Sequence, residues 1–179
     1  MLSALILIIY SSFGAKTKKV AVADLRITNQ IPDWKERDGT FSAFDPKKLF
    51  ELIDGGAPEY NERGLIEGIH QQLVGKDKRA MELFAEDFGS PDNAGQMLSY
   101  KKASLGEAIP FPGIDSSRAF AYQVIGGYYV FIVIDRFYLE LLLTGVKDKD
   151  ASCAEVSRFI NYYATRIQKL SGVKKLKAK

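Results

Sequence analysis

The chain has 179 residues, of which 46% are apolar and 26% are charged. These proportions are those of an ordinary globular domain, and they exclude a disordered, a collagen-like or a multi-span membrane protein. The single Cys and the single His exclude a disulfide framework and a zinc site built from several such residues.

The net charge of +3 comes from the two ends of the chain. Seven lysines lie outside residues 20–172, and the 18 basic and 22 acidic residues between these limits leave an acidic body. Nucleic acid is therefore not an expected partner. The lysine-rich tail, residues 173–179, could contact an anionic membrane surface peripherally, or it could be a solvated terminus.

An uncharged apolar run extends from Leu2 to Phe13 and is followed by Gly14 and Ala15. It is shorter than the roughly 20 residues of a membrane-spanning helix, so residues 1–14 are expected to be a signal peptide and the mature chain to begin at Ala15 in the periplasm or outside the cell. No positive side chain precedes the run. Two alternatives stay open, an uncleaved membrane tether and a buried strand.

Residues 15–44 are expected to form a linker and an edge segment. Asp45 and Pro46 are typical of a helix start, Gly55 and Gly56 of its end, and Pro58 of a second short helix. Two strand-like runs between residues 65 and 88 flank a polar turn at residues 75–78 and indicate a hairpin. Ser90 and Pro91 then predict the next helix start.

In the second half, residues 119–125, 128–135 and 137–144 are rich in β-branched and aromatic residues and predict three consecutive strands. A helix is expected from Ser152 to Ser171, with Ser152 and Glu155 as a capping box. The order of elements predicts a single α+β domain over residues 45–172, with a mostly antiparallel sheet and helices packed on one face.

No phosphate-binding loop, dinucleotide fingerprint or Gly-x-Ser-x-Gly turn occurs in the sequence. Carboxylates remain that could bind a hard cation or act as an acid/base pair if the fold brings them together, although capping and solvated surface positions are the more usual explanation for such residues. They are Asp54, Glu59, Glu62, Glu86 and Asp87.

His70 lies in a strand-like run, where a half-buried sheet residue is more usual than a catalytic base. Aromatic residues of the second half are expected to form core and sheet surface, with a ligand or partner surface as the alternative. They are Phe120, Tyr122, Tyr128, Tyr129, Phe131, Phe137 and Tyr138.

Two motifs carry a resemblance to a known family. Residues 52–60 read Leu-Ile-Asp-Gly-Gly-Ala-Pro-Glu-Tyr, and residues 86–95 read Glu-Asp-Phe-Gly-Ser-Pro-Asp-Asn-Ala-Gly. Over residues 44–167 the chain resembles domain-of-unknown-function family 6599, with Asp54 in place of the usual Asn, Pro58 at the usual Glu position and Glu59 one place later. The resemblance implies an exported domain and brings no activity with it.

Because a rigid glycine turn that bears polar groups is a common place for function, we expect the ligand or partner site at this corner. The predicted site residues are Asp54, Gly55, Gly56, Glu59, Tyr60, Asp87 and His70. We favour an exported, non-enzymatic module that binds a small ligand or an envelope protein, and we assign no catalytic residue, metal or cofactor. The alternative is a carboxylate-based hydrolase or metal-dependent enzyme at the same turn, with His70 as its base.

Overall fold

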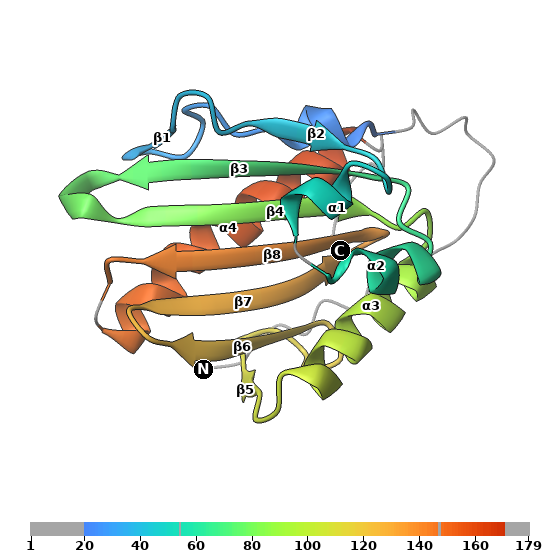
Figure 1. Ribbon diagram of the computed structural model, residues 1–179. Helices are drawn as coiled ribbons and strands as arrows, with labels where there is room; N and C mark the ends of the chain where they lie inside the picture. The colour runs from blue at the N-terminus through green and yellow to red at the C-terminus, as the bar shows by residue number, and fades with distance from the viewer. Residues whose placement is uncertain (1–19, 54, 147, 171–179) are drawn as a thin grey trace, which may run out of the picture.

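A computed structural model describes residues 20–53, 55–146 and 148–170. Its centre is one eight-stranded sheet in the order β1-β3-β4-β8-β7-β6-β5, and β2 pairs with the same outer edge of β3 as β1 does (Figure 1). Every neighbouring pair is antiparallel. The strands are β1 (Trp34–Glu36), β2 (Ser42–Phe44), β3 (Glu67–Gly75), β4 (Ala80–Asp87), β5 (Ile109–Pro110), β6 (Ala119–Val124), β7 (Gly127–Ile134) and β8 (Phe137–Thr144).

Helices cover both faces of this sheet. In Figure 1, α4 lies behind the strands while α1, α2 and α3 lie in front of them. The helices are α1 (Leu49–Leu52), α2 (Ala57–Glu62), α3 (Pro91–Ser104) and α4 (Lys149–Leu170), with the 3-10 turns η1 (Val22–Leu25) and η2 (Lys76–Lys78). None of these helices is both long enough and apolar enough to cross a membrane.

The α+β class and the antiparallel sheet are confirmed, but the helices do not lie on one face only. Alternate residues of β7 explain the difference. Val130 and Ile132 enter the core under α4, whereas Phe131 and Val133 enter a second core under α2 and α3. A strand that is apolar at successive positions is suited to burial on both faces. The seven aromatic residues of the second half pack in these cores, where all but Tyr122 and Tyr129 are fully buried.

The segment before residue 45 is part of the fold from Val20 onward. It adds β1 and β2 to the edge of the sheet. Leu25 and Ile27 have no exposed surface and Trp34 is 2% exposed, all three in the core beneath α4. The predicted signal peptide, with its alternatives, and the lysine tail lie outside the described residues.

Most local signals act as expected. The predicted turn at residues 75–78 joins β3 to β4, and a turn that contains Gly126 joins β6 to β7. Ser90 Oγ accepts a hydrogen bond from the Asn93 amide, which caps α3. Asp45 Oδ1 accepts from the amides of Lys47 and Lys48, but this turn leads into only the four residues of α1.

The predicted capping box at the start of the last helix is wrong. Helix α4 begins at Lys149, because Asp148 Oδ1 accepts from the Ala151 amide at 2.7 Å and so acts as the cap. Ser152 is buried and donates to the Asp148 carbonyl instead. Cys153 therefore lies in the second turn, buried and 3.4 Å from the Tyr128 hydroxyl.

Candidate functional site

The glycine corner is the connection from α1 to α2. Gly55 has φ of +72°, a conformation that strains residues with a Cβ, so the turn depends on glycine at this position. Asp54 lies outside the described residues. After the turn, Glu59 and Tyr60 diverge: Glu59 is half-buried at the surface, while Tyr60 is buried between α2 and the sheet.

Tyr60 belongs to a buried polar network centred on Glu140. Its hydroxyl donates to Glu140 Oε1 at 2.5 Å, and the Tyr129 hydroxyl donates to Glu140 Oε2. Lys101 of α3 completes the network, since its Nζ donates to the Tyr60 oxygen at 2.8 Å and lies 3.4 Å from Glu140 Oε1. Glu140 is only 4% exposed, so these contacts hold its charge in a largely dry environment.

The network keeps its phenols protonated. Burial, followed by the charge of Glu140, raises the pKa of both Tyr60 and Tyr129 far above the ordinary value. These two side chains therefore serve as hydrogen-bond donors and not as nucleophiles. The ammonium of Lys101 also lies over the rings of Tyr60 and Phe131, at 5.1 and 5.9 Å from their centroids. The arrangement ties α2, α3 and the sheet together.

Glu86 lies on the same face, on the strand next to Glu140. Its side chain is fully buried, and Oε2 has no hydrogen-bond partner among the described residues. Burial, and then the negative charge of Glu140, raise the pKa of Glu86 well above the ordinary value. Glu86 thus favours its protonated form beside Glu140, and it is not among the residues that line either surface groove described below.

His70 is not part of this network. Phe84 of β4 pairs in register with both His70 and Glu140, so its ring position separates the two. The imidazole stacks on Phe84 with ring centroids 4.4 Å apart, and its Nε2 is 2.9 Å from a Glu82 carboxylate oxygen. His70 is therefore placed as a half-buried sheet residue.

Asp87 is buried at the end of β4, on the opposite face from Glu86. Its Oδ1 accepts from the Gly89 amide, and its Oδ2 lies 2.9 Å from Arg136 Nη2. These contacts hold the turn from β4 into α3. The predicted site residues Tyr60, His70 and Asp87 thus lie in three separate environments. The described residues contain no group of three or more His, Cys, Asp or Glu side chains placed to hold a metal ion.

A shallow groove of about 830 Å³ lies at the C-terminal end of α2, between α3 and the loop before β6. We call it the corner groove. Arg63, at the end of α2, places its guanidinium 3.9 Å above the ring of Tyr100 and donates to the Glu59 carbonyl. The lining of the corner groove consists of Arg63, Pro91, Asp92, Gly95, Gln96, Ser99, Tyr100 and Ser117.

The corner groove adjoins Glu59, a predicted site residue that lies near the surface beside Tyr100. Glu59 Oε2 is buried and has no hydrogen-bond partner among the described residues. Loss of hydration, and then the charge of Glu59, raise the pKa of the Tyr100 phenol. Glu59, Arg63 and Tyr100 therefore interact at the edge of this groove.

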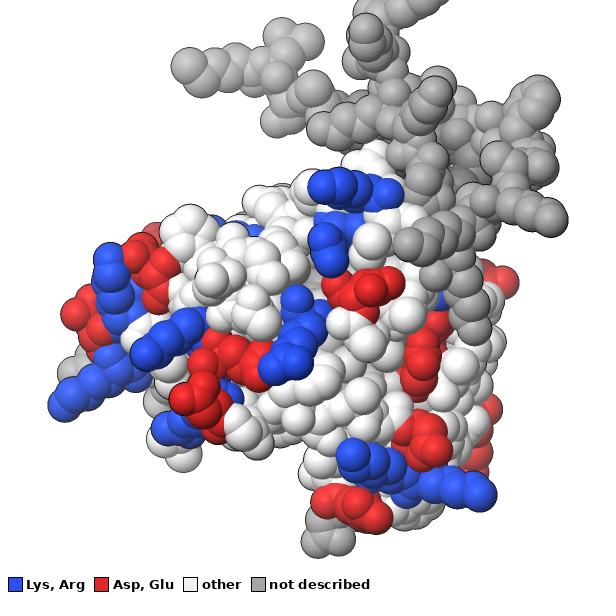
Figure 2. Space-filling view, turned by 90° about the horizontal axis from the view of Figure 1, so that it is seen from above, with Lys and Arg blue, Asp and Glu red and all other residues white. Residues whose placement is uncertain are grey.

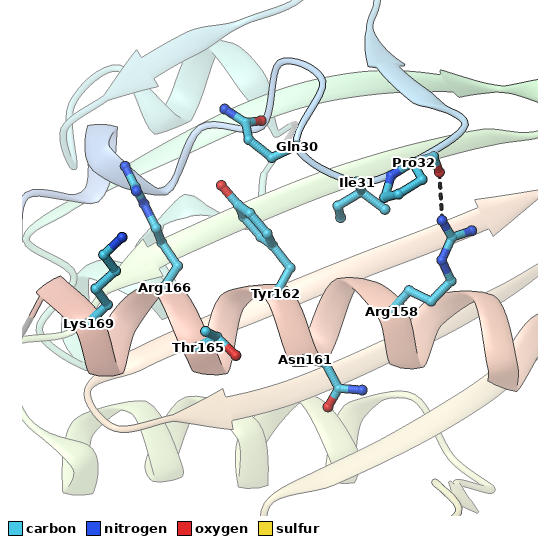
Figure 3. A pocket seen from close by; sticks show the side chains of 9 residues that line it. All are labelled: Gln30, Ile31, Pro32, Arg158, Asn161, Tyr162, Thr165, Arg166 and Lys169. Atoms are coloured by element: carbon cyan, nitrogen blue, oxygen red, sulfur yellow. Dashed lines mark hydrogen bonds between the residues drawn. The ribbon is translucent and has the colours of Figure 1, made fainter. Parts of the chain in front are cut away.

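A second groove of about 550 Å³ runs along α4, on the other side of the sheet (Figure 3). We call it the α4 groove. Figure 3 shows Arg158 and Tyr162 directed from the helix toward the segment that contains Gln30, Ile31 and Pro32. Arg166 extends toward Asp24 in η1, to whose carbonyl it donates a hydrogen bond. The full lining of the α4 groove is Gln30, Ile31, Pro32, Arg158, Asn161, Tyr162, Thr165, Arg166 and Lys169.

Charges of both signs are mixed on the face of the molecule seen in Figure 2. Seen from above, Lys and Arg residues lie in small groups beside Asp and Glu residues, separated by uncharged surface (Figure 2). Within the part of this face that the described residues form, there is no extended area of one sign of the kind that binds nucleic acid.

Sequence reasoning missed three members of the buried network, Glu140, Lys101 and Tyr129. One signal was visible for Glu140, because it is the only charged residue in the apolar run of residues 137–143. A charge in such a run needs a partner when it is buried. The partner Tyr60 is 80 residues away in the chain, and no local pattern identifies it.

Comparison with known proteins leaves the family open. No family model and no curated protein matches the chain. Among solved structures, the extracellular domain of PknH from Mycobacterium tuberculosis is similar with 8% identity and a TM-score of 0.48, over 82% of this chain and 92% of that one. An uncharacterized protein of Mycobacterium smegmatis has 11% identity and a TM-score of 0.35, over 84% and 97%. Likenesses at this level identify neither a family nor an activity.

Proposed function

We propose that this protein is an exported binding domain that takes a small, neutral, hydroxyl-rich ligand, such as a sugar, in the corner groove. Export is supported by the apolar run at residues 2–13. Mass spectrometry of the chain recovered from cell fractions tests this part. A chain in the envelope or medium that begins at Ala15 supports cleavage and export, whereas recovery from the cytoplasm contradicts them.

The observation that carries the binding proposal is the interlocked pair Arg63 and Tyr100. The Glu59 carbonyl accepts a hydrogen bond from Arg63 Nη1 at 2.6 Å, which holds the guanidinium over the aromatic ring. A fixed aromatic side chain with a polar end supplies contact area and a hydrogen-bonding group at little entropic cost. This is the kind of element around which binding surfaces are built.

The remaining lining determines the chemistry of the ligand. Asp92 and Arg63 contribute one charge of each sign, and Gln96, Ser99 and Ser117 both donate and accept hydrogen bonds. A ligand with many hydroxyl groups, which are also donors and acceptors, matches this lining better than a charged ligand does. The predicted site residues Asp54, Gly55, Gly56 and Glu59 have an indirect role in this proposal. The glycine corner positions α2, and α2 in turn positions Arg63.

Gly95 offers a direct way to test the groove. It lies in α3 within the lining, and an added Cβ would meet no heavy atom within 4 Å. Gly95→Leu would therefore place an apolar side chain in the groove without touching the core. It should also favour the helix, because Gly is disfavoured in helix interiors by about 1 kcal/mol. Ala154→Leu is the matched control, at an exposed position of α4 outside both grooves.

The experiment is a thermal unfolding screen with glucose, N-acetylglucosamine, maltose and cellobiose, and with glycine and uridine as other chemical classes. Binding to the folded state raises the unfolding midpoint. We expect at least one sugar to raise it in the wild-type and Ala154→Leu proteins but not in Gly95→Leu. A shift that persists in Gly95→Leu, or a panel in which no sugar causes a shift, would overturn the proposal.

A further inference from the structure

The α4 groove differs from the corner groove in its charge. Arg158, Arg166 and Lys169 contribute three positive charges, and no Asp or Glu is among its lining residues. The other polar side chains, Asn161, Tyr162 and Thr165, each carry a hydrogen-bond donor. Every polar side chain of the groove on α4 can thus donate a hydrogen bond to an oxyanion.

The two arginines are held in place by the protein. Arg158 donates to a Glu155 carboxylate oxygen and, with the other terminal nitrogen, to the Pro32 carbonyl, each at 2.6 Å (Figure 3). Arg166 donates from Nε to the Asp24 carbonyl at 3.1 Å. The terminal nitrogens of Arg166 have no hydrogen bond among the described residues. Because its side chain is already ordered, little conformational entropy remains to be lost when an anion binds.

The acidic groups near Arg158 are shared with other cations, Asp33 with Lys76 and Glu155 with Arg79. Glu155 balances Arg79 as well as Arg158, with carboxylate to guanidinium distances of 2.9 and 2.6 Å. Lys169 forms no ion pair among the described residues. A cation in the last turn also favours the helix itself, which would explain Lys169 alone. It does not explain Arg158, which lies about three turns earlier.

The spacing of the charges along the helix indicates the size of the ligand. Arg158, Tyr162 and Arg166 follow each other at intervals of four residues and so lie on one side of α4. At 1.5 Å per residue, Arg158 and Arg166 are about 12 Å apart along the axis. One small anion would contact only part of this row, whereas a ligand with two or more anionic groups in line could contact all of it.

We propose that the α4 groove is a second binding site, independent of the corner groove, for a ligand that carries linked phosphate groups. The planar guanidinium of Arg166 donates two parallel hydrogen bonds to a tetrahedral oxyanion, and Lys169 adds a positive charge at the same end. Arg158 and the Tyr162 hydroxyl contact the next group. The phosphates could belong to a soluble molecule or to the headgroups of a lipid surface.

The experiment measures binding of inorganic tripolyphosphate to the full chain by titration calorimetry, and of the same chain to phosphatidylglycerol vesicles by sedimentation. The test variant is Arg166→Gln with Lys169→Gln. The control is Lys35→Gln with Lys47→Gln, which removes the same charge at exposed positions outside the groove. Arg158 is left unchanged because it holds Glu155 and Pro32.

We expect one-to-one binding of tripolyphosphate, weakened about tenfold or more in the test variant and at most slightly in the control, since hydrogen bonds to charged groups are among the stronger ones. Binding to vesicles alone, with the same dependence on Arg166 and Lys169, would assign the phosphates to lipid headgroups. Absence of binding to both probes, or equal losses in the two variants, would overturn the proposal. If the double variant unfolds, Lys169→Gln, at an exposed position, replaces it with the same criteria.

Discussion

Glu140 shows how one charged residue can hold several elements together. It lies in the middle of β8, and its neighbours Leu139 and Leu141 are fully buried in the opposite core. Two tyrosine hydroxyls and the ammonium of Lys101 surround its carboxylate. Because a buried charge without partners is strongly destabilising, this carboxylate favours the one arrangement in which α2 and α3 both reach β8.

Glu86 makes stability depend on pH. Its pKa in the folded protein lies well above 4.5, whereas the unfolded chain has about the ordinary value. As the pH rises from about 4.5 toward the folded pKa, the unfolded state releases a proton that the folded state retains, so the free energy of unfolding should fall by up to about 1.4 kcal/mol per pH unit. Glu86→Gln should lack this decline and be more stable than the wild type at neutral pH.

Urea unfolding of both proteins at several pH values between about 5 and 8 measures this effect. Comparison with the variant isolates Glu86 from Asp135, whose pKa burial also raises. Parallel curves for the two proteins would contradict the assignment.

At the scale of elements, the start of α4 is determined by a side chain that lies just outside the helix. Glu155 accepts from the Trp34 indole at 2.6 Å and pairs with Arg79 and Arg158. It is therefore engaged in tertiary contacts, and the cap of α4 is Asp148. A local motif of the right composition can thus be overruled when its residues find partners elsewhere.

Asp148→Ala should lower the free energy of unfolding by about 1 kcal/mol, because the Ala151 amide at the start of α4 would lose its side-chain acceptor. Asp148→Asn keeps an acceptor oxygen and should cost much less. Chemical denaturation of the three proteins measures the difference. Equal losses in the Asn and Ala variants would show that charge, and not capping geometry, is responsible.

At the scale of the whole molecule, the segment from Val20 to Phe44 completes the domain. It covers the outer edge of β3 with β1 and β2 and fills the core beneath α4 with Leu25, Ile27 and Trp34. Removing several fully buried side chains exposes the apolar surface that they cover, and each large one typically contributes about 2 to 5 kcal/mol.

A chain of residues 20–170 should therefore unfold cooperatively, whereas a chain of residues 45–170 should fail to reach the native state. Near-ultraviolet circular dichroism and urea unfolding distinguish the two, since the fixed packing of the tyrosines gives a signal only in the folded protein. Cooperative unfolding of the shorter chain would contradict the role of the first segment.

The sequence by itself determined the elements whose signals are local. The hairpin at residues 75–78, the capped start of α3 at Ser90 and the strand pair that meets at Gly126 each depend on a few neighbouring residues. Alternation within residues 137–144 is likewise a local property that puts Leu139 and Leu141 on the face opposite to Glu140, because side chains of a strand alternate between the faces of the sheet.

Only the tertiary structure decided which distant residues meet. Of the predicted site residues, Tyr60 meets Glu140 from 80 positions away in the chain. Phe84 separates His70 from Glu140, and Asp87 lies on the opposite face of the sheet. The α4 groove combines residues 30–32 with the last helix, more than 120 positions later. These sites depend on how a two-sided sheet is covered, and that choice follows from the packing of all the apolar surfaces together and not from any one segment.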